Sequence, residues 1–189
     1  MSGLQDEALA TLRAWQAPDE EQRRLQTTYV DHLQRHPDGT SRDAWPAHLT
    51  VGALVLSADH SQVLLTLHAK AGRWFHLGGH CEPDDPTLLA AAAREAREES
   101  GLDDLVLDEE PLHLDTHAVP FCGPHERVDH LDVRFLAVAA PGSRPVVSEE
   151  SLDVRWWPLD ELPSEEAGLR TMVALALGRV AAQRSSAAI

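Results

Sequence analysis

Three glutamates near the middle of the chain have a spacing suited to binding a metal ion. Glu95, Glu98 and Glu99 fall within residues 88–102, an Ala- and Leu-rich stretch that favours a helix. Their carboxylates would lie on one face near the C-terminal end, where like charges repel and the helix dipole disfavours acids. A divalent cation would turn this repulsion into attraction. The alternative is a solvated acidic surface on which Arg94 pairs with Glu98.

The segment before this helix supports the metal interpretation. It contains Gly78 and Gly79, which lack a Cβ and let the backbone approach a ligand closely. Three further acids follow, Glu82, Asp84 and Asp85. Mg²⁺ prefers oxygen ligands from carboxylates, backbone carbonyls and water. The loop and the helix together therefore predict a magnesium site.

The sequence of residues 78–102, GGHCEPDDPTLLAAAAREAREESGL, resembles the Nudix box, whose pattern is GX5EX7REUXEEXGU with U aliphatic. In the first half, Gly79 matches the leading glycine only if one extra residue is allowed before Arg94, and Asp85 then stands where the family has a glutamate. The second half matches at Arg94, Glu95, Ala96, Glu98, Glu99, Gly101 and Leu102.

This resemblance implies a fold and an activity. The fold is the Nudix-type α/β/α sandwich with a mixed sheet, spanning roughly His48 to Leu162. The activity is hydrolysis of the pyrophosphate bond in a nucleoside diphosphate linked to another moiety, with Mg²⁺ or Mn²⁺ as cofactor. The box covers only a small part of the chain, so the substrate stays open among ADP-ribose, dinucleotides, sugar nucleotides, damaged dNTPs and coenzyme A.

The resemblance also assigns roles to residues. Arg94 would orient the glutamates, and Glu95 and Glu98 are catalytic candidates as well as metal ligands. The metal ligands would be Glu95, Glu98, Glu99 and the carbonyl of Gly78. Residues with a structural role in the loop and helix would be Gly79, Glu82, Asp85 and Gly101.

The general base is open between Glu95 and an acid on a distant loop. Residues 121–130, FCGPHERVDH, are expected to form such a loop. Glu126 is our candidate base, with His125 and Arg73 as candidates for substrate binding. The alternative is that the loop residues are merely solvated.

The rest of the chain shows the periodicities of an α/β protein. Residues 3–36 predict two amphipathic helices, with Asp19 as N-cap of the second. Residues 49–57 and 62–69 predict a strand pair, and residues 73–79, 105–119, 129–140 and 154–158 further strands. Residues 164–183 predict a last helix, with Leu169, Met172, Val173, Ala176 and Val180 facing inward.

These elements suggest three segments. Residues 1–45 would form an N-terminal helical extension, 46–183 the Nudix hydrolase domain and 184–189 a flexible tail. The extension could be a dimerisation arm, a lid or plain packing. The family resemblance keeps a homodimer open beside a monomer.

Composition excludes several classes of protein. Acids outnumber bases 31 to 16 in 189 residues, a formal net charge of -15, so general nucleic-acid binding is not expected. No signal peptide and no apolar run of about 18 residues is present, which predicts a cytoplasmic protein without a membrane span. Cys122 and His125 have a zinc-like spacing, but no second pair accompanies them, so zinc is disfavoured.

Two other functions remain as alternatives. The first is a Nudix-fold sensor or regulatory module that binds a nucleotide metabolite without hydrolysing it. Such modules usually lose box glutamates, whereas this chain keeps all three. The second is an isoprenoid diphosphate isomerase, for which the sequence shows no suitable pair of cysteine and glutamate.

Overall fold

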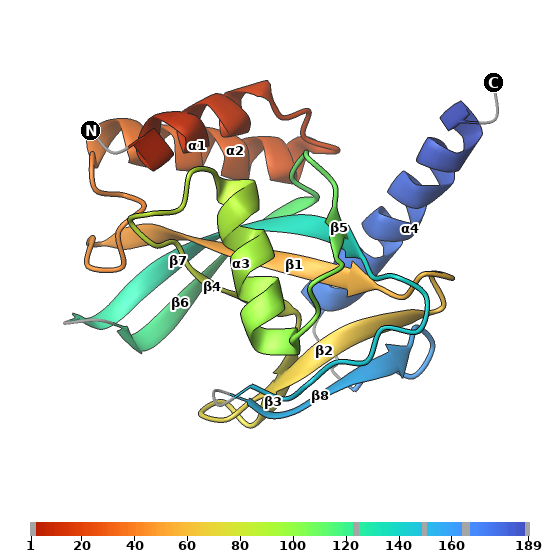
Figure 1. Cartoon of the computed structure of the whole chain (residues 1–189). Coiled ribbons are helices and arrows are strands. Elements are labelled where there is room, and N and C mark those ends of the chain that lie inside the picture. Colours follow the sequence, from red (N-terminus) through yellow and green to blue (C-terminus); the bar gives the residue numbers. More distant parts are fainter. Residues whose placement is uncertain (1–2, 123–124, 149–150, 164–166, 188–189) are drawn as a thin grey trace. The chain divides into compact units, whose positions relative to one another are not determined.

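The computed structural model describes residues 3–122, 125–148, 151–163 and 167–187, and the chain divides into two compact units. Strands β1 (Ala47–Leu56) and β7 (His125–Val138) and helix α3 (Leu88–Ser100) run through both units (Figure 1). Unit 1 contains Met1–Gly52, Gly78–Glu95 and Glu109–Phe135, and unit 2 contains Ala53–Leu77, Ala96–Asp108 and Leu136–Ile189.

The two predicted N-terminal helices belong to unit 1. They are α1 (Gly3–Ala14) and α2 (Glu20–Arg35), which lie side by side in Figure 1. The predicted N-cap is confirmed, because the Asp19 carboxylate accepts a 2.8 Å hydrogen bond from the backbone N–H of Gln22. The α1 residues Leu4, Ala8 and Leu12 are buried.

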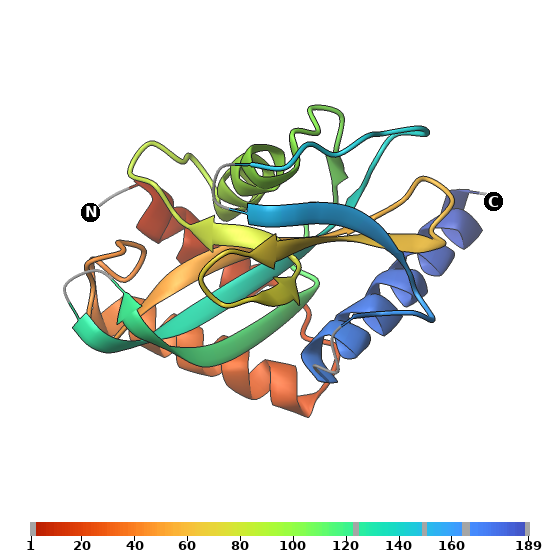
Figure 2. The same cartoon turned by 90° about the horizontal axis from the view of Figure 1, so that it is seen from below.

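Helix α2 packs on strand β6 (His113–Cys122) through polar side chains (Figure 2). The Gln22 side-chain amide donates to the Leu114 carbonyl at 3.0 Å and accepts from the Leu114 N–H at 2.7 Å. A neighbouring strand would form the same two hydrogen bonds with the backbone of Leu114. The Tyr29 hydroxyl donates to the Asp115 carbonyl at 2.5 Å. The N-terminal helices therefore satisfy the backbone of β6 and are an integral layer of unit 1.

Residues 121–130 are not the loop that we expected. Strand β6 continues to Cys122, and β7 begins at His125, with antiparallel pairing from His113↔Arg134 to Cys122↔His125. The continued strands satisfy their backbone groups through this pairing, and Val128 is buried while Glu126 is exposed. Only residues 123–124 separate the strands, and they lie outside the described residues.

Unit 2 is organised around strand β2 (Gln62–His68). It pairs antiparallel with β1 (Val55↔Leu64), with β3 (Arg73–Phe75) and with β8 (Ser151–Pro158). Strand β5 (Val106–Leu107) pairs with the end of β7. The core of this unit contains Ala53, Val55, Leu64, Leu77, Ala96, Leu102, Leu105, Ala137, Ala139 and Val154.

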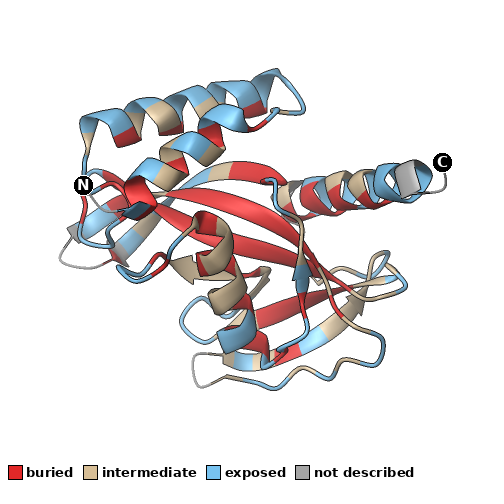
Figure 3. Ribbon diagram, turned by 45° about the horizontal axis from the view of Figure 1, so that its top comes forward, coloured by how far each residue is buried: buried red, intermediate tan, exposed pale blue. Residues whose placement is uncertain are grey.

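The last helix, α4 (Ala167–Ala187), has the predicted apolar stripe, with Leu169, Met172, Val173, Ala176 and Val180 buried. Figure 3 shows burial along one side of this helix and exposure along the other. The helix continues past residue 183, where we expected a tail. A guanidinium nitrogen of Arg184 lies 3.0 Å from His60 Nδ1, and the Ser185 hydroxyl donates to the Ala181 carbonyl at 3.0 Å.

The predicted α/β class with added N-terminal helices is confirmed, and the strand order is β3-β2-β1-β7-β5. Strand β4 (Leu77–His80) pairs with β1, and β6 with β7. In the part of the chain that is described, no helix is both long and apolar enough to cross a membrane. The division at residues 45/46 and 183/184 stays a prediction.

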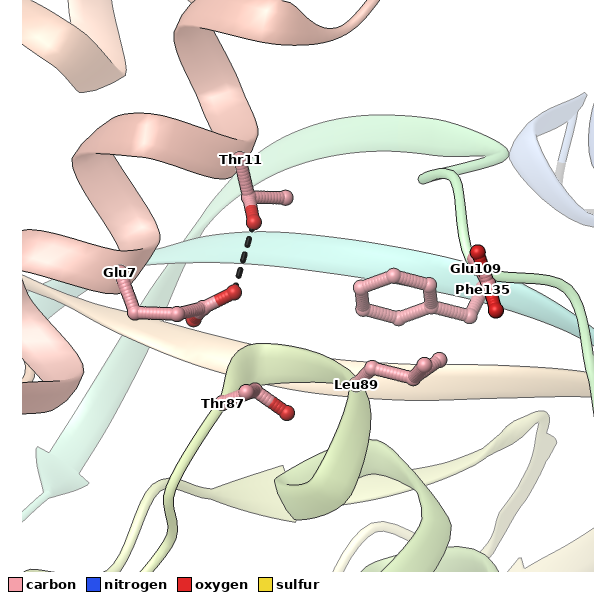
Figure 4. Close-up of a pocket in the computed structure, with 6 residues that line it drawn as sticks. All are labelled: Glu7, Thr11, Thr87, Leu89, Glu109 and Phe135. Carbon is pink, nitrogen blue, oxygen red and sulfur yellow. Dashed lines mark hydrogen bonds between the residues drawn. The ribbon is translucent and has the colours of Figure 1, made fainter.

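Helix α1 also contributes to the start of α3. The Leu88 N–H donates to the Glu7 carboxylate at 2.9 Å, and the Thr11 hydroxyl holds the other Glu7 oxygen at 2.7 Å (Figure 4). Thr87 supplies the N-cap by accepting from the Ala90 N–H at 2.9 Å. A carboxylate from a distant helix therefore binds one of the otherwise unpaired N–H groups of α3 and interacts favourably with its dipole.

We expect Glu7→Ala to lower the free energy of unfolding by about 1 kcal/mol, because it removes this acceptor from the start of α3. Urea denaturation at neutral pH measures the change. The matched control is Asp6→Ala, an exposed neighbour on α1, which should change stability by less than about 0.5 kcal/mol. Equal effects of the two variants would contradict a specific role for Glu7.

Candidate functional site

The Arg94 guanidinium connects three parts of the predicted site within unit 1. It forms a two-pronged ion pair with Asp85, at 3.1 and 2.9 Å. It also donates to the His80 carbonyl at 2.9 Å and to the Glu95 carboxylate at 3.0 Å. The hydrogen bonds to Asp85 and then to Glu95 raise the pKa of Arg94, so the group stays charged. One side chain thus joins the loop, strand β4 and helix α3.

Asp85, the partner of Arg94, also stabilises the loop through hydrogen bonds to Glu82. Its carboxylate accepts from the Glu82 N–H at 2.7 Å, and its own N–H donates to the Glu82 carbonyl at 3.1 Å. Burial by itself raises the pKa of Asp85, but the hydrogen bonds from Arg94 and Glu82 outweigh it and leave the pKa below its usual value. The Glu82 carboxylate is exposed, 3.8 Å from Arg94.

The two glycines of β4 permit two close approaches. A Cβ on Gly79 would lie 2.6 Å from an oxygen of the Glu95 carboxylate, so this carboxylate lies directly against the loop backbone. A Cβ on Gly78 would lie 2.4 Å from the carbonyl oxygen of Val51, so β4 can approach β1 only with glycine there. The Glu95 side chain is 15% exposed, partly enclosed but open to a ligand.

Helix α3 carries the predicted glutamates on consecutive turns and ends where expected. Glu98 is exposed and Glu99 is buried. Gly101 follows the last helical residue with φ +67°, and its N–H donates to the Arg97 carbonyl at 2.7 Å. This left-handed conformation favours glycine and closes the helix.

The structure gives less information about the predicted base and the predicted substrate-binding residues. Glu126 is exposed on β7, and the side chain of His125 lies outside what the structure describes. Arg73 is exposed at the start of β3 in unit 2, with its guanidinium 5.9 Å from the centre of the Phe75 ring. Their roles as base and substrate-binding residues stay predictions.

A cluster that sequence reasoning did not find lies beside the loop, within unit 1. The potential ligand atoms of His48, His80, Cys122 and His130 all lie within 4.8 Å of one another. Burial lowers the pKa of His80 to about 4 and that of His130 to about 3, so both imidazoles are neutral at pH 7. Cys122 had drawn attention in the sequence through its zinc-like spacing to His125, whose side chain lies outside what the structure describes.

A cavity of about 220 Å³ lies at the start of α3 (Figure 4). Because α3 rises about 1.5 Å per residue, Leu89 is roughly 9 Å along the axis from Glu95, so we assign no substrate to this cavity. It is lined by Glu7, Thr11, Thr87, Leu89, Glu109 and Phe135.

The sequence pattern of the NUDIX domain matches residues 46–176. No curated protein matches the chain. A hydrolase of the NUDIX family from Clostridium perfringens is similar in structure, with 25% identity and a TM-score of 0.54 over 68% of this chain and 95% of that one.

Two more distant structures share the fold. An Ap4A hydrolase of C. elegans, in a binary complex, has 18% identity and a TM-score of 0.55 over 71% of this chain and 98% of its own. The NUDIX domain of NrtR from Shewanella oneidensis, complexed with ADP ribose, has 18% identity and a TM-score of 0.51 over 74% of this chain and 92% of its own.

The ion pair between Arg94 and Asp85 gives the stability of the chain a defined pH dependence. Because the pKa of Asp85 is lower in the folded protein, its contribution is present above the unfolded value of about 4 and is lost as the pH falls through the folded value. We expect Asp85→Asn to cost about 2 kcal/mol at pH 7 and much less near pH 2. Denaturant unfolding at both pH values measures this.

The control for that experiment is Asp84→Asn, an exposed residue in the same loop. It should change stability little at either pH. A loss in Asp85→Asn that is equally large at low pH would show that the charge of Asp85 is not what stabilises the loop.

Proposed function

This chain belongs to the Nudix family, and from that premise we propose that it hydrolyses the pyrophosphate bond of a nucleoside diphosphate linked to another moiety, with Mg²⁺ or Mn²⁺ as cofactor. The observation that carries the proposal is the placement of Glu95, whose carboxylate lies against Gly79 and is held by Arg94. A carboxylate fixed in this way, on a helix with two further glutamates one turn later, is prepared to bind a cation.

The residues present fit a hard divalent cation. Glu95, Glu98 and Glu99 offer carboxylate oxygens, the Gly78 carbonyl is a further candidate ligand, and the absence of a Cβ at Gly79 leaves room beside Glu95. When bound, Mg²⁺ offsets the charge of the pyrophosphate and lowers the pKa of water. Because the chain has a formal net charge of -15, a bound cation would also reduce the repulsion of an anionic substrate.

The residues around the acidic helix orient Glu95 and accept the proton of the attacking water. Arg94 orients Glu95, and Asp85 fixes Arg94. A water oxygen attacks phosphorus, the phosphoanhydride P–O bond breaks, and the departing phosphate leaves with the bonding electron pair. We assign acceptance of the water proton to Glu126, or to Glu95 if Glu126 is dispensable.

The setting that we propose is the reduced cytoplasm. Both cysteines are free thiols and are buried. The substrate is a small molecule, not a nucleic acid or a membrane, because the excess of acids opposes binding to polyphosphate backbones. The assembly state is either monomer or homodimer, and size-exclusion chromatography with light scattering decides between them.

The experiment that tests the proposal is a substrate panel with Mg²⁺ and with Mn²⁺, the products being resolved by chromatography. The panel contains ADP-ribose, dinucleoside polyphosphates, sugar nucleotides, dNTPs including oxidised ones, and coenzyme A. We expect metal-dependent cleavage between two phosphorus atoms. Tight nucleotide binding with no product over hours would instead support a sensor without hydrolysis.

We expect the double variant Glu98→Gln/Glu99→Gln to reduce turnover by about 10³-fold or more, because it removes two anionic ligands and keeps the shape of both side chains. The protein should stay folded, and stability without metal should rise slightly as repulsion is relieved. Steady-state kinetics and circular dichroism measure the two effects. Asp103→Asn/Asp104→Asn, an exposed acidic pair just after α3, is the control.

We expect Gly79→Ala to affect metal use while the fold is kept. The new methyl group would meet the flexible end of Glu95 at 2.6 Å, so the carboxylate must move and the backbone need not. The Mg²⁺ concentration for half-maximal activity should rise several-fold, with little change in Tm. Gly178→Ala, where nothing lies within 4 Å of the added Cβ, is the control. An unchanged Mg²⁺ requirement in Gly79→Ala would separate Glu95 from the metal.

A further inference from the structure

Four potential soft-metal ligands from four strands meet beside strand β4. His48 comes from β1, His80 from β4, Cys122 from β6 and His130 from β7, and their ligand atoms lie within 4.8 Å of one another. The strands are labelled in Figure 1. His48 and Cys122 are buried, and His80 and His130 are partly buried. All four belong to unit 1, and none is among the proposed ligands for Mg²⁺.

The distances within this cluster fit tetrahedral coordination. The Cys122 sulfur lies 3.2 Å from Nε2 of His80, 3.4 Å from Nε2 of His130 and 3.8 Å from Nε2 of His48. Zinc bonds of about 2.3 Å to sulfur and about 2.0 Å to nitrogen, at a tetrahedral angle, place the two ligand atoms about 3.5 Å apart. The three observed separations are distributed around that value.

The three imidazole rings surround the sulfur in a compact arrangement. Their centroids are 4.9 Å apart for His48 and His130, 5.0 Å for His80 and His130, and 5.2 Å for His48 and His80. The rings are tilted at 43°, 86° and 50° in the same order, so they do not stack face to face. This geometry gives little ring-on-ring contact, while the ligand atoms of all four side chains stay within 4.8 Å of one another.

The tautomer of His48 is set by a neighbouring backbone group. Its Nδ1 lies 3.2 Å from the Ala44 carbonyl oxygen, which can only accept a hydrogen bond. The proton must therefore be on Nδ1, and the lone pair of Nε2 faces Cys122. A carbonyl that binds the second ring nitrogen is the usual partner of a metal-binding histidine, because it orients the ring and raises its basicity.

Hydrogen bonds alone explain this arrangement poorly. A thiol has one proton, so Cys122 can donate to only one of the three nitrogens that face it, and the other contacts need an imidazole N–H that donates to the weakly accepting sulfur. Bonds to sulfur are weak, so they offset little of the cost of enclosing the buried His48 and the partly buried His80 and His130. A metal ion satisfies all four groups at once.

We propose that His48, His80, Cys122 and His130 form a tetrahedral transition-metal site for Zn²⁺, separate from the acidic site on α3. Binding forms three Zn–N bonds and one Zn–S bond, and the Cys122 thiol proton is released to solvent. Four protein ligands fill the coordination shell, as in structural zinc sites, so this ion does not activate water. Nitrogen and sulfur ligands select borderline and soft metals, whereas the carboxylates of α3 select Mg²⁺.

The proposed ion would stabilise the loop that precedes the acidic helix α3. The His80 carbonyl accepts a hydrogen bond from Arg94, while the His80 ring belongs to the cluster. Fixing that ring to β1, β6 and β7 therefore fixes the backbone that binds Arg94. The zinc site is a structural support of unit 1 and not a part of the reaction.

Cobalt substitution of the full-length protein tests the proposal. We expect one equivalent of Co²⁺ to produce intense tetrahedral d–d bands and a thiolate-to-cobalt charge-transfer band in the near ultraviolet, both lost on addition of one equivalent of Zn²⁺. The charge-transfer band requires sulfur, so the carboxylates of α3 cannot produce it. Elemental analysis of protein purified without chelator should give about one zinc per chain.

Two variants distinguish the cluster from other sites. Cys122→Ser should abolish the charge-transfer band, and His130→Asn should weaken zinc binding by at least about 10-fold in a competition titration with a chromophoric chelator. Cys81→Ser, at the other buried cysteine, is the matched control and should keep the band. The double variant Glu98→Gln/Glu99→Gln should also keep it.

The result on the unmodified protein decides the proposal even if a variant fails to fold. A wild-type protein that shows no charge-transfer band, and contains less than about one tenth of an equivalent of zinc, would overturn it. A band that survives in folded Cys122→Ser would also overturn it, because the sulfur would then be that of Cys81. A wild-type protein that shows the band but hydrolyses nothing in the substrate panel would count against the proposed function only.

Discussion

The charge of Arg94 determines how the loop and the acidic helix of this protein fit together. Its side chain is only 20% exposed, and a guanidinium so enclosed needs partners for its donors. Asp85, Glu95 and the His80 carbonyl supply them, from the loop, the helix and strand β4. The one-residue insertion and the aspartate in the Nudix box are compatible with this geometry, because Asp85 still presents both oxygens to Arg94.

Two kinds of ligand chemistry lie next to each other on β4 and its neighbours. The oxygen atoms of α3 suit a hard cation that exchanges with substrate, whereas the nitrogen and sulfur atoms around Cys122 suit a closed, permanent site. His80 belongs to both surroundings, since its carbonyl faces Arg94 and its ring faces Cys122. His80 therefore links the proposed zinc site, through its ring, to Arg94, through its carbonyl. Arg94 in turn orients Glu95.

The N-terminal helices are bound to unit 1 by specific polar contacts. Gln22 and Tyr29 satisfy backbone groups of β6, and Glu7 binds the first N–H of α3. These contacts favour packing over a mobile lid as the role of the helices. They also explain why the polar Gln22 side chain is buried on α2 beside Tyr29 and Leu33.

The sequence by itself determined the features that depend on local spacing. These are the limits of α3, the glycine that ends it, the Asp19 cap and the apolar stripe of α4, because helix geometry brings residues three and four apart together. The long hairpin of β6 and β7 depended on pairing with a partner strand, and a stretch with Gly and Pro predicted a loop instead. Only the tertiary structure brought Cys122 to His48, His80 and His130, which are 74, 42 and 8 residues away. No local pattern records such distances, because separate strands meet only when the chain has folded.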